Sequence, residues 1–145
     1  MSNSIIKYKS KYFNPNDCIL IMSLCQIKEF IKGIDLPVWV SQYFVDVIDV
    51  IIDVQPIGWC DLELDEYFDS QHKNIFFINL LKECISNLNK RADDWIRYEE
   101  VNNLFKLEGI EKWGEKNYIL IQDVTDCLGD LVLLLDEEIE TDFRE

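Results

Sequence analysis

Charged and apolar residues follow a helical period along residues 36–54, LPVWVSQYFVDVIDVIIDV. Three aspartates and one glutamine have the spacing i, i+4, i+7 and i+11. They are Gln42, Asp46, Asp49 and Asp53. That spacing places the four side chains on one stripe of a helix, whereas a strand would require a period of two. Asp35 can cap this helix and Pro37 suits its first turn, while Pro56 and Gly58 end it. The pattern predicts a buried central helix with one solvated, acidic edge.

The N-terminal part of the chain contains a strand pattern followed by a helix pattern. Residues 5–13, IIKYKSKYF, alternate lysines with other side chains, which is typical of a half-buried edge strand with a basic outer face. Asn14 can cap a helix that continues to Lys32, with Gly33 just after its end. The alternative is a strand over residues 18–22 followed by a shorter helix. We favour the single helix.

Two further helices are predicted in the middle of the chain. Ser70 can cap a helix over residues 71–89, whose apolar side chains recur at helical spacing. After the next turn, Asp93 or Asp94 can cap a helix that continues to about Lys106. The inner side of that helix is marked by Trp95, Tyr98, Val101, Leu104 and Phe105.

The C-terminal part of the chain permits two interpretations. Residues 118–124, YILIQDV, form a second strand candidate, and Thr125 can cap a last helix over residues 126–139. The apolar run 131–135 could instead be a strand that forms a hairpin with 118–124. The acidic tail, residues 137–145, is expected to be frayed.

These elements together predict a mainly α fold. We expect a single domain over residues 1–145 with about five helices and a small two-stranded β piece, an α+β arrangement being the alternative. A chain of 145 residues with 48% hydrophobic residues can bury a sizeable core. No apolar run reaches the length of a membrane span, and residues 1–11 lack the apolar region of a signal peptide. The five cysteines are odd in number and lack C-x-x-C spacing, which indicates reduced thiols in a cytoplasmic protein.

Charge is distributed unevenly along the chain. The net charge is −14, but residues 1–34 contain five lysines against two acidic residues. Residues 35–70 contain nine acidic residues and no lysine or arginine, residues 71–117 contain eight of each sign, and residues 118–145 contain nine acidic residues and one arginine. Such a surface repels nucleic acid and anionic membranes and attracts a basic partner. Acidic charge also serves solubility, but its segregation into blocks favours a partner.

The densest acidic-aromatic stretch lies at residues 55–70, QPIGWCDLELDEYFDS. Aromatic side chains surrounded by carboxylates are typical of protein interfaces, in which the rings supply buried area and the acids pair with Arg or Lys. The alternative is that the aromatic residues belong to the core and the acids are their solvated neighbours. The candidate partner-binding residues are Asp46, Asp49, Asp53, Trp59, Asp61, Glu63, Asp65, Glu66, Tyr67 and Asp69.

Signatures of catalysis and of cofactor binding are missing from the sequence. His72 is the only histidine, and this composition argues against a zinc site and against a nucleophile–base pair. No G-x-G-x-x-G or phosphate-loop motif occurs, and no basic patch with interleaved aromatic residues for nucleic acid is present. Asp46, Asp49 and Asp53 could hold a divalent ion, but no phosphate-binding loop accompanies them. We therefore expect neither an enzyme nor a bound metal or cofactor.

In size, acidic charge and expected cytoplasmic location, the chain resembles the small immunity proteins of bacterial toxin–immunity systems, including the contact-dependent growth-inhibition type. The resemblance implies a protein that binds a toxin domain, often a basic nuclease, and covers its active site. It involves no motif, so it assigns no residue. Two alternatives are a nucleic-acid mimic that inhibits a defence nuclease and a carboxylate-based metal-binding enzyme.

Overall fold

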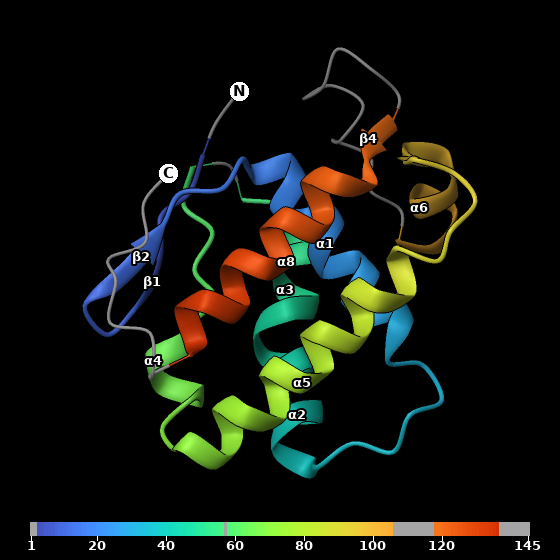
Figure 1. Cartoon of the computed structure of the whole chain (residues 1–145). Helices are drawn as coiled ribbons and strands as arrows, with labels where there is room; N and C mark the ends of the chain where they lie inside the picture. Colours follow the sequence, from blue (N-terminus) through green and yellow to red (C-terminus); the bar gives the residue numbers. More distant parts are fainter. Residues whose placement is uncertain (1–2, 57, 106–117, 137–145) are drawn as a thin grey trace.

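The computed structural model describes residues 3–56, 58–105 and 118–136, and this part of the chain is mainly α with two short antiparallel strand pairs (Figure 1). In chain order the elements are β1 (Ile6–Tyr8), β2 (Lys11–Phe13), α1 (Asp17–Phe30), α2 (Val38–Tyr43), the π-helix η1 (Phe44–Ile48), α3 (Asp49–Val54), α4 (Leu64–Tyr67), α5 (Gln71–Leu88), β3 (Trp95–Arg97), α6 (Tyr98–Phe105), β4 (Tyr118–Leu120) and α8 (Ile121–Leu135). Helix α8 packs on α5 and on α1, and α1 also contacts α3. The prediction of a mainly α fold with a minor β component is confirmed.

The predicted central helix is present as one continuous element made of α2, η1 and α3. Val47 and Ile51 are buried against the core, whereas Asp46 and Asp53 are exposed. This distribution confirms that the segment is helical, as the spacing of the aspartates predicted, because a strand would have alternated these positions with period two.

The two ends of the central helix differ in how well the sequence predicted them. Pro37 precedes the first helical residue and no side chain caps the helix there, so the assignment of Asp35 as the cap is wrong. At the other end, Gln55 adopts the left-handed conformation with φ 53°. Pro56 and Gly58 follow, and the helix ends where they predicted.

The predicted N-terminal strand is a hairpin. Residues 5–13 reverse direction at Lys9, which has φ 55°, and Ile6 pairs with Phe13 across the two strands. The alternation of inner and outer side chains therefore restarts after the turn, and Tyr12 is exposed while Phe13 is buried. A single period of two across the whole segment concealed this turn.

Helix α1 confirms the single-helix interpretation of this segment and corrects its cap. The cap is Asn16, whose Oδ1 atom accepts a hydrogen bond from the backbone N–H of Ile19 at 3.2 Å. Asn14, the predicted cap, lies before the helix, and backbone pairing with the N-terminal segment keeps Asn16 extended. The helix ends before the predicted Lys32, and Gly33 occupies the following turn with φ 80°.

The predicted helix over residues 71–89 is confirmed as α5. Ser70 is extended, with φ −146° and ψ 151°, and its Oγ atom accepts a hydrogen bond from the N–H of Lys73 at 3.3 Å. This is the N-cap geometry that the sequence predicted.

A strand replaces the start of the next predicted helix. Neither Asp93 nor Asp94 caps it, because β3 comes first and pairs with β4, with Ile96 opposite Ile119. Trp95 is 38% exposed at the edge of this pair and does not mark the inner side of a helix. The partner strand is far away in the sequence, so the local pattern could not reveal it. The described part of the chain does not include Lys106, the predicted end of the helix, or the side chains of Leu104 and Phe105.

Helix α8 starts earlier than predicted and excludes the hairpin alternative. Of residues 118–124 only the first three form a strand, and the helix begins at Ile121. Thr125 is not its cap, since the Thr125 hydroxyl lies inside the helix and donates to a carbonyl of the preceding turn at 3.2 Å. Residues 131–135 are helical, so they form no strand. The tail, residues 137–145, lies outside the described residues.

Candidate functional site: an acidic groove

The candidate residues come mainly from two segments that the fold brings side by side, the central helix and the chain between α3 and α5. The hydroxyl of Tyr67 donates to Oδ2 of Asp46 at 2.9 Å. One turn before Asp46, the buried Tyr43 hydroxyl donates to the carbonyl of Leu62 at 2.7 Å. The Tyr43 and Tyr67 rings are 5.0 Å apart between centroids. These contacts hold the acidic-aromatic stretch against the acidic edge of the helix.

A groove of about 220 Å³ opens between these two segments, and we call it the acidic groove. Its lining residues are Asp46, Val47, Val50, Ile51, Val54, Pro56, Trp59, Asp61 and Glu63. Val47 and Ile51 are buried and form its floor, while Val50 is 49% exposed and Val54 57% exposed. Trp59 is 67% exposed, and no lysine or arginine belongs to the lining in the described part of the chain. Among the described residues, the groove therefore combines accessible apolar surface with carboxylates that have no basic neighbour in the lining.

Carboxylates gather closely enough at this groove to repel one another. The pKa of Glu63 is raised above its ordinary value, first because the carboxyl group is partly desolvated and then because of Glu66, Asp61 and Asp46. The pKa of Tyr67 is raised mainly because its hydroxyl donates to Asp46. A cation placed among these groups would relieve the repulsion.

The loop that presents Trp59 is anchored by a buried polar network. The Ser4 hydroxyl donates to Oδ1 of Asp17, and Ser4 Oγ accepts from the N–H of Cys60 at 2.9 Å. Oδ2 of Asp17 accepts from the N–H of Gly58 at 2.6 Å. Ser4 is fully buried and Asp17 is 3% exposed. The N-terminal segment and the start of α1 thus fix the backbone on both sides of Trp59.

The backbone at the two ends of this loop adopts an uncommon conformation. Gln55, which ends α3, and Glu63, which precedes α4, have positive φ values of 53° and 49°. Residues other than glycine adopt such values in only a few per cent of cases. The N–H of Glu63 donates to Oδ1 of Asp61 at 2.8 Å, so the second of these conformations is supported by a side chain of the groove itself.

Three of the predicted carboxylates are engaged away from the groove. Asp49 pairs with Lys28 of α1 at 2.6 Å. The carboxylate of Asp65 accepts a hydrogen bond from the backbone N–H of Lys9 at 2.8 Å and so supports the turn between β1 and β2. Asp69 pairs with Lys73 one helical turn later at 3.0 Å. These three lie outside the groove lining, as does Asp53, which is exposed on α3.

The π-helix explains why the predicted acidic stripe is divided. The N–H of Asp49 donates to the carbonyl of Phe44, an i→i+5 bond that encloses one more residue than the i→i+4 bond of an α-helix. Side chains after this turn are displaced around the axis relative to those before it. Asp46 therefore faces the acidic-aromatic stretch, while Asp49 faces α1.

The apolar walls of the groove were not among the predicted site residues. The prediction of a buried helix with one acidic edge implies that Val50 and Val54 are buried, but both are about half exposed. A signal for them does exist, because Val47, Val50, Ile51 and Val54 follow the spacing i, i+3, i+4 and i+7 of one helix face. The sequence does not show which part of that face is left uncovered.

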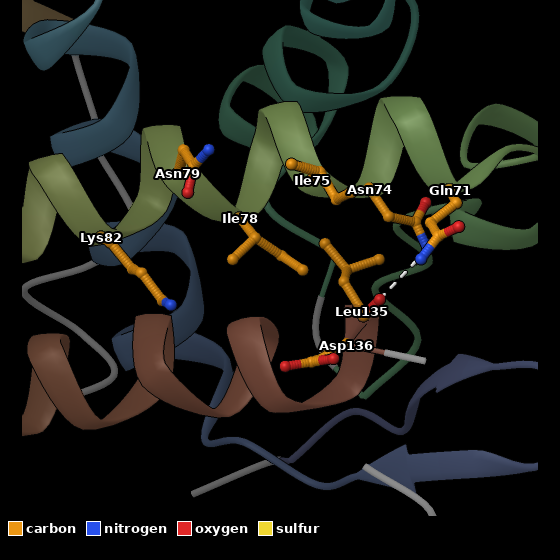
Figure 2. A pocket seen from close by; sticks show the side chains of 8 residues that line it. All are labelled: Gln71, Asn74, Ile75, Ile78, Asn79, Lys82, Leu135 and Asp136. Atoms are coloured by element: carbon orange, nitrogen blue, oxygen red, sulfur yellow. Dashed lines mark hydrogen bonds between the residues drawn. The ribbon is translucent and has the colours of Figure 1, made fainter. Parts of the chain in front are cut away.

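A second hollow lies between α5 and the end of α8 and has different chemistry (Figure 2). Its volume is about 200 Å³, and its lining contains one cation, Lys82, and one carboxylate, Asp136. The amide of Asn74 in this hollow joins elements of the fold, since its Nδ2 atom donates to the carbonyl of Leu135 at 3.1 Å and to the Tyr8 hydroxyl at 2.9 Å. The mixed charge and the structural role of Asn74 make this hollow the weaker candidate.

The described residues contain neither a metal-binding cluster nor a membrane-spanning helix. No group of three or more His, Cys, Asp or Glu side chains there is arranged to hold a metal ion, and His72 is exposed at the start of α5. None of the helices in this part of the chain has the length and apolar character to cross a membrane. No family model, curated protein or solved structure matches the chain.

Proposed function

We propose that this chain is a binding protein that neutralises a basic protein partner, and that the partner is a toxin nuclease domain to which the chain acts as a cytoplasmic immunity protein. The observation that supports the proposal is the acidic groove. It exposes Val50, Val54 and Trp59 next to three carboxylates, and none of the described residues in its lining is basic. Accessible apolar and aromatic side chains beside acids form the kind of surface that anchors a cationic partner.

The proposed mechanism is occlusion rather than catalysis, and the chain is not an enzyme in this proposal. The apolar walls and Trp59 lose their contact with water on binding, which supplies affinity. The carboxylates Asp46, Asp61, Glu63 and Glu66 occupy positions that phosphates of nucleic acid would take on the nuclease. The excess of negative charge, −14 for the whole chain, accelerates the encounter with a basic surface.

The experiment begins with capture of the partner from the source organism, identification by mass spectrometry and an assay of its nuclease activity. Support requires a basic nuclease domain whose activity disappears when one equivalent of the protein is added. The proposal is contradicted if no such domain is captured, or if the nuclease stays active in the complex.

Surface plasmon resonance with the captured partner then tests which face makes contact. Charge reversal uses Asp61→Lys and Glu63→Lys in the lining of the groove and Glu66→Lys, whose carboxylate acts on Glu63. The matched control reverses three exposed carboxylates elsewhere, with Glu83→Lys, Glu99→Lys and Asp126→Lys. We expect the first triple variant to lower the on-rate by about tenfold or more relative to the control, because steering depends on local charge. The on-rate should also fall as the Debye length shrinks from about 30 Å at 0.01 M salt to about 8 Å at 0.15 M. Equal losses from the two variants would exclude the acidic groove as the contact face.

A further inference from the structure

The size of the acidic groove limits what it can hold. Sites for cofactors and drug-sized ligands measure about 300–1,000 Å³. The acidic groove, at about 220 Å³, is smaller than this and is open to solvent along its exposed walls. Its volume therefore suits one long side chain better than a cofactor or a helix.

The lining of the groove selects the kind of side chain. Val50 and Val54 offer apolar surface for an aliphatic stem. Trp59 is 67% exposed, and within the described residues no other ring or cation lies against its indole. Asp61 and Glu63 offer carboxylate oxygens in the same lining. An aliphatic stem, a planar cation that stacks on an aromatic face and paired donors for carboxylates are the properties of arginine.

Lysine fits this lining less well. Its ammonium group is compact and strongly hydrated, so removing its water beside Val50 and Val54 is costly. A guanidinium group is more weakly hydrated, can lie flat on Trp59 and donates two parallel hydrogen bonds to one carboxylate. The combination of indole and carboxylates in one small groove favours arginine for this reason.

We propose that the acidic groove receives a single arginine side chain of the partner, with its stem between Val50 and Val54, its guanidinium on the Trp59 ring and its N–H groups on Asp61 and Glu63. This inference rests on the proposed function, because it names the group through which a basic partner is held. The raised pKa of Glu63 agrees with it, since a cation between Glu63 and its acidic neighbours removes the repulsion that contributes to the raised pKa.

The test uses the full chain and needs no partner. N-acetyl-arginine amide is titrated into isotope-labelled protein, and the Trp59 indole N–H and the methyl groups of Val50 and Val54 are followed by NMR. A Trp59→Phe variant assigns the indole signal. We expect saturable shifts at these three residues. The uncharged isostere N-acetyl-citrulline amide should bind with an affinity at least about tenfold lower, because it lacks the charge that carboxylates recognise. N-acetyl-lysine amide should also bind more weakly than the arginine probe.

Matched variants separate the groove from general acidity. Asp61→Asn with Glu63→Gln removes two charges from the groove and should weaken the arginine probe by about tenfold. Glu83→Gln with Asp126→Asn removes two exposed charges elsewhere and should leave its affinity unchanged. Shifts that are absent, that lie elsewhere on the surface, or that citrulline or lysine reproduces at equal affinity would overturn the arginine assignment. Such a failure is distinct from failure of the proposed function, which is decided by capture of the partner and by nuclease inhibition.

Discussion

Replacing Ser4 with alanine tests whether the buried network that anchors the Trp59 loop stabilises the fold. The Ser4 hydroxyl donates to the buried carboxylate of Asp17 and accepts from the N–H of Cys60. A hydrogen bond to a charged group contributes about 1.5–3 kcal/mol, and a buried N–H left without a partner costs about 1–3 kcal/mol. The two contributions are not additive, so we expect Ser4→Ala to lower the free energy of unfolding by about 3 kcal/mol. For a chain of this length that corresponds to a fall of about 10 °C in Tm.

The assay is urea unfolding followed by circular dichroism, with amide hydrogen exchange of Gly58 and Cys60 as a local readout. Ser86→Ala is the control, because Ser86 is exposed on α5 and alanine suits a helix interior. We expect Ser4→Ala to accelerate exchange at Gly58 and Cys60 more than exchange at the centre of α1. A loss below about 0.5 kcal/mol, the range of ordinary surface substitutions, would refute the role assigned to Ser4.

Three further predictions concern the helix phase, pH and the thiols. Val47→Asp should unfold the protein because it buries an unpaired charge, whereas Val45→Asp, at a position that is 60% exposed, should leave the Tm nearly unchanged in a thermal melt. The pKa of Glu63 is higher in the folded than in the unfolded state, so the folded state binds more protons and this residue lowers stability as pH rises above 4.5. Glu63→Gln should reduce that loss when unfolding free energies are measured across this pH range. Burial raises the pKa of Cys25 and of Cys84 to about 12, so neither thiol should react with iodoacetamide at neutral pH until the protein is unfolded.

Some elements could be recognised from the sequence because their causes are local. The helical character of residues 38–54 follows from the spacing of Asp46 and Asp53 against Val47 and Ile51, and the structure confirms it. The Ser70 cap of α5 is equally local, since donor and acceptor are three residues apart. The helical period and a cap such as that of Ser70 act within one or two turns of chain, so the sequence can show them. Predicted caps failed where pairing with a distant segment moved the start of the helix, as at Asn14 and at Asp93 or Asp94.

Other elements depend on partners that are remote in the sequence. β3 forms because Ile96 pairs opposite Ile119, and a local helical pattern around Trp95 concealed it. The hairpin at residues 5–13 similarly needs the left-handed Lys9, which a pattern of period two does not reveal. Strand pairing is decided by whichever segment the fold places alongside, so its prediction requires the tertiary structure.

The candidate site shows the same division. The sequence by itself determined that acids and aromatic residues gather in residues 55–70 and along one side of the central helix. Only the tertiary structure decided which of these similar carboxylates face the groove. Asp49 lies beyond the π-turn and meets Lys28, whereas Asp46 lies within it and meets Tyr67. Identical side chains have different roles here because their partners come from other elements, and the sequence alone does not place those elements beside them.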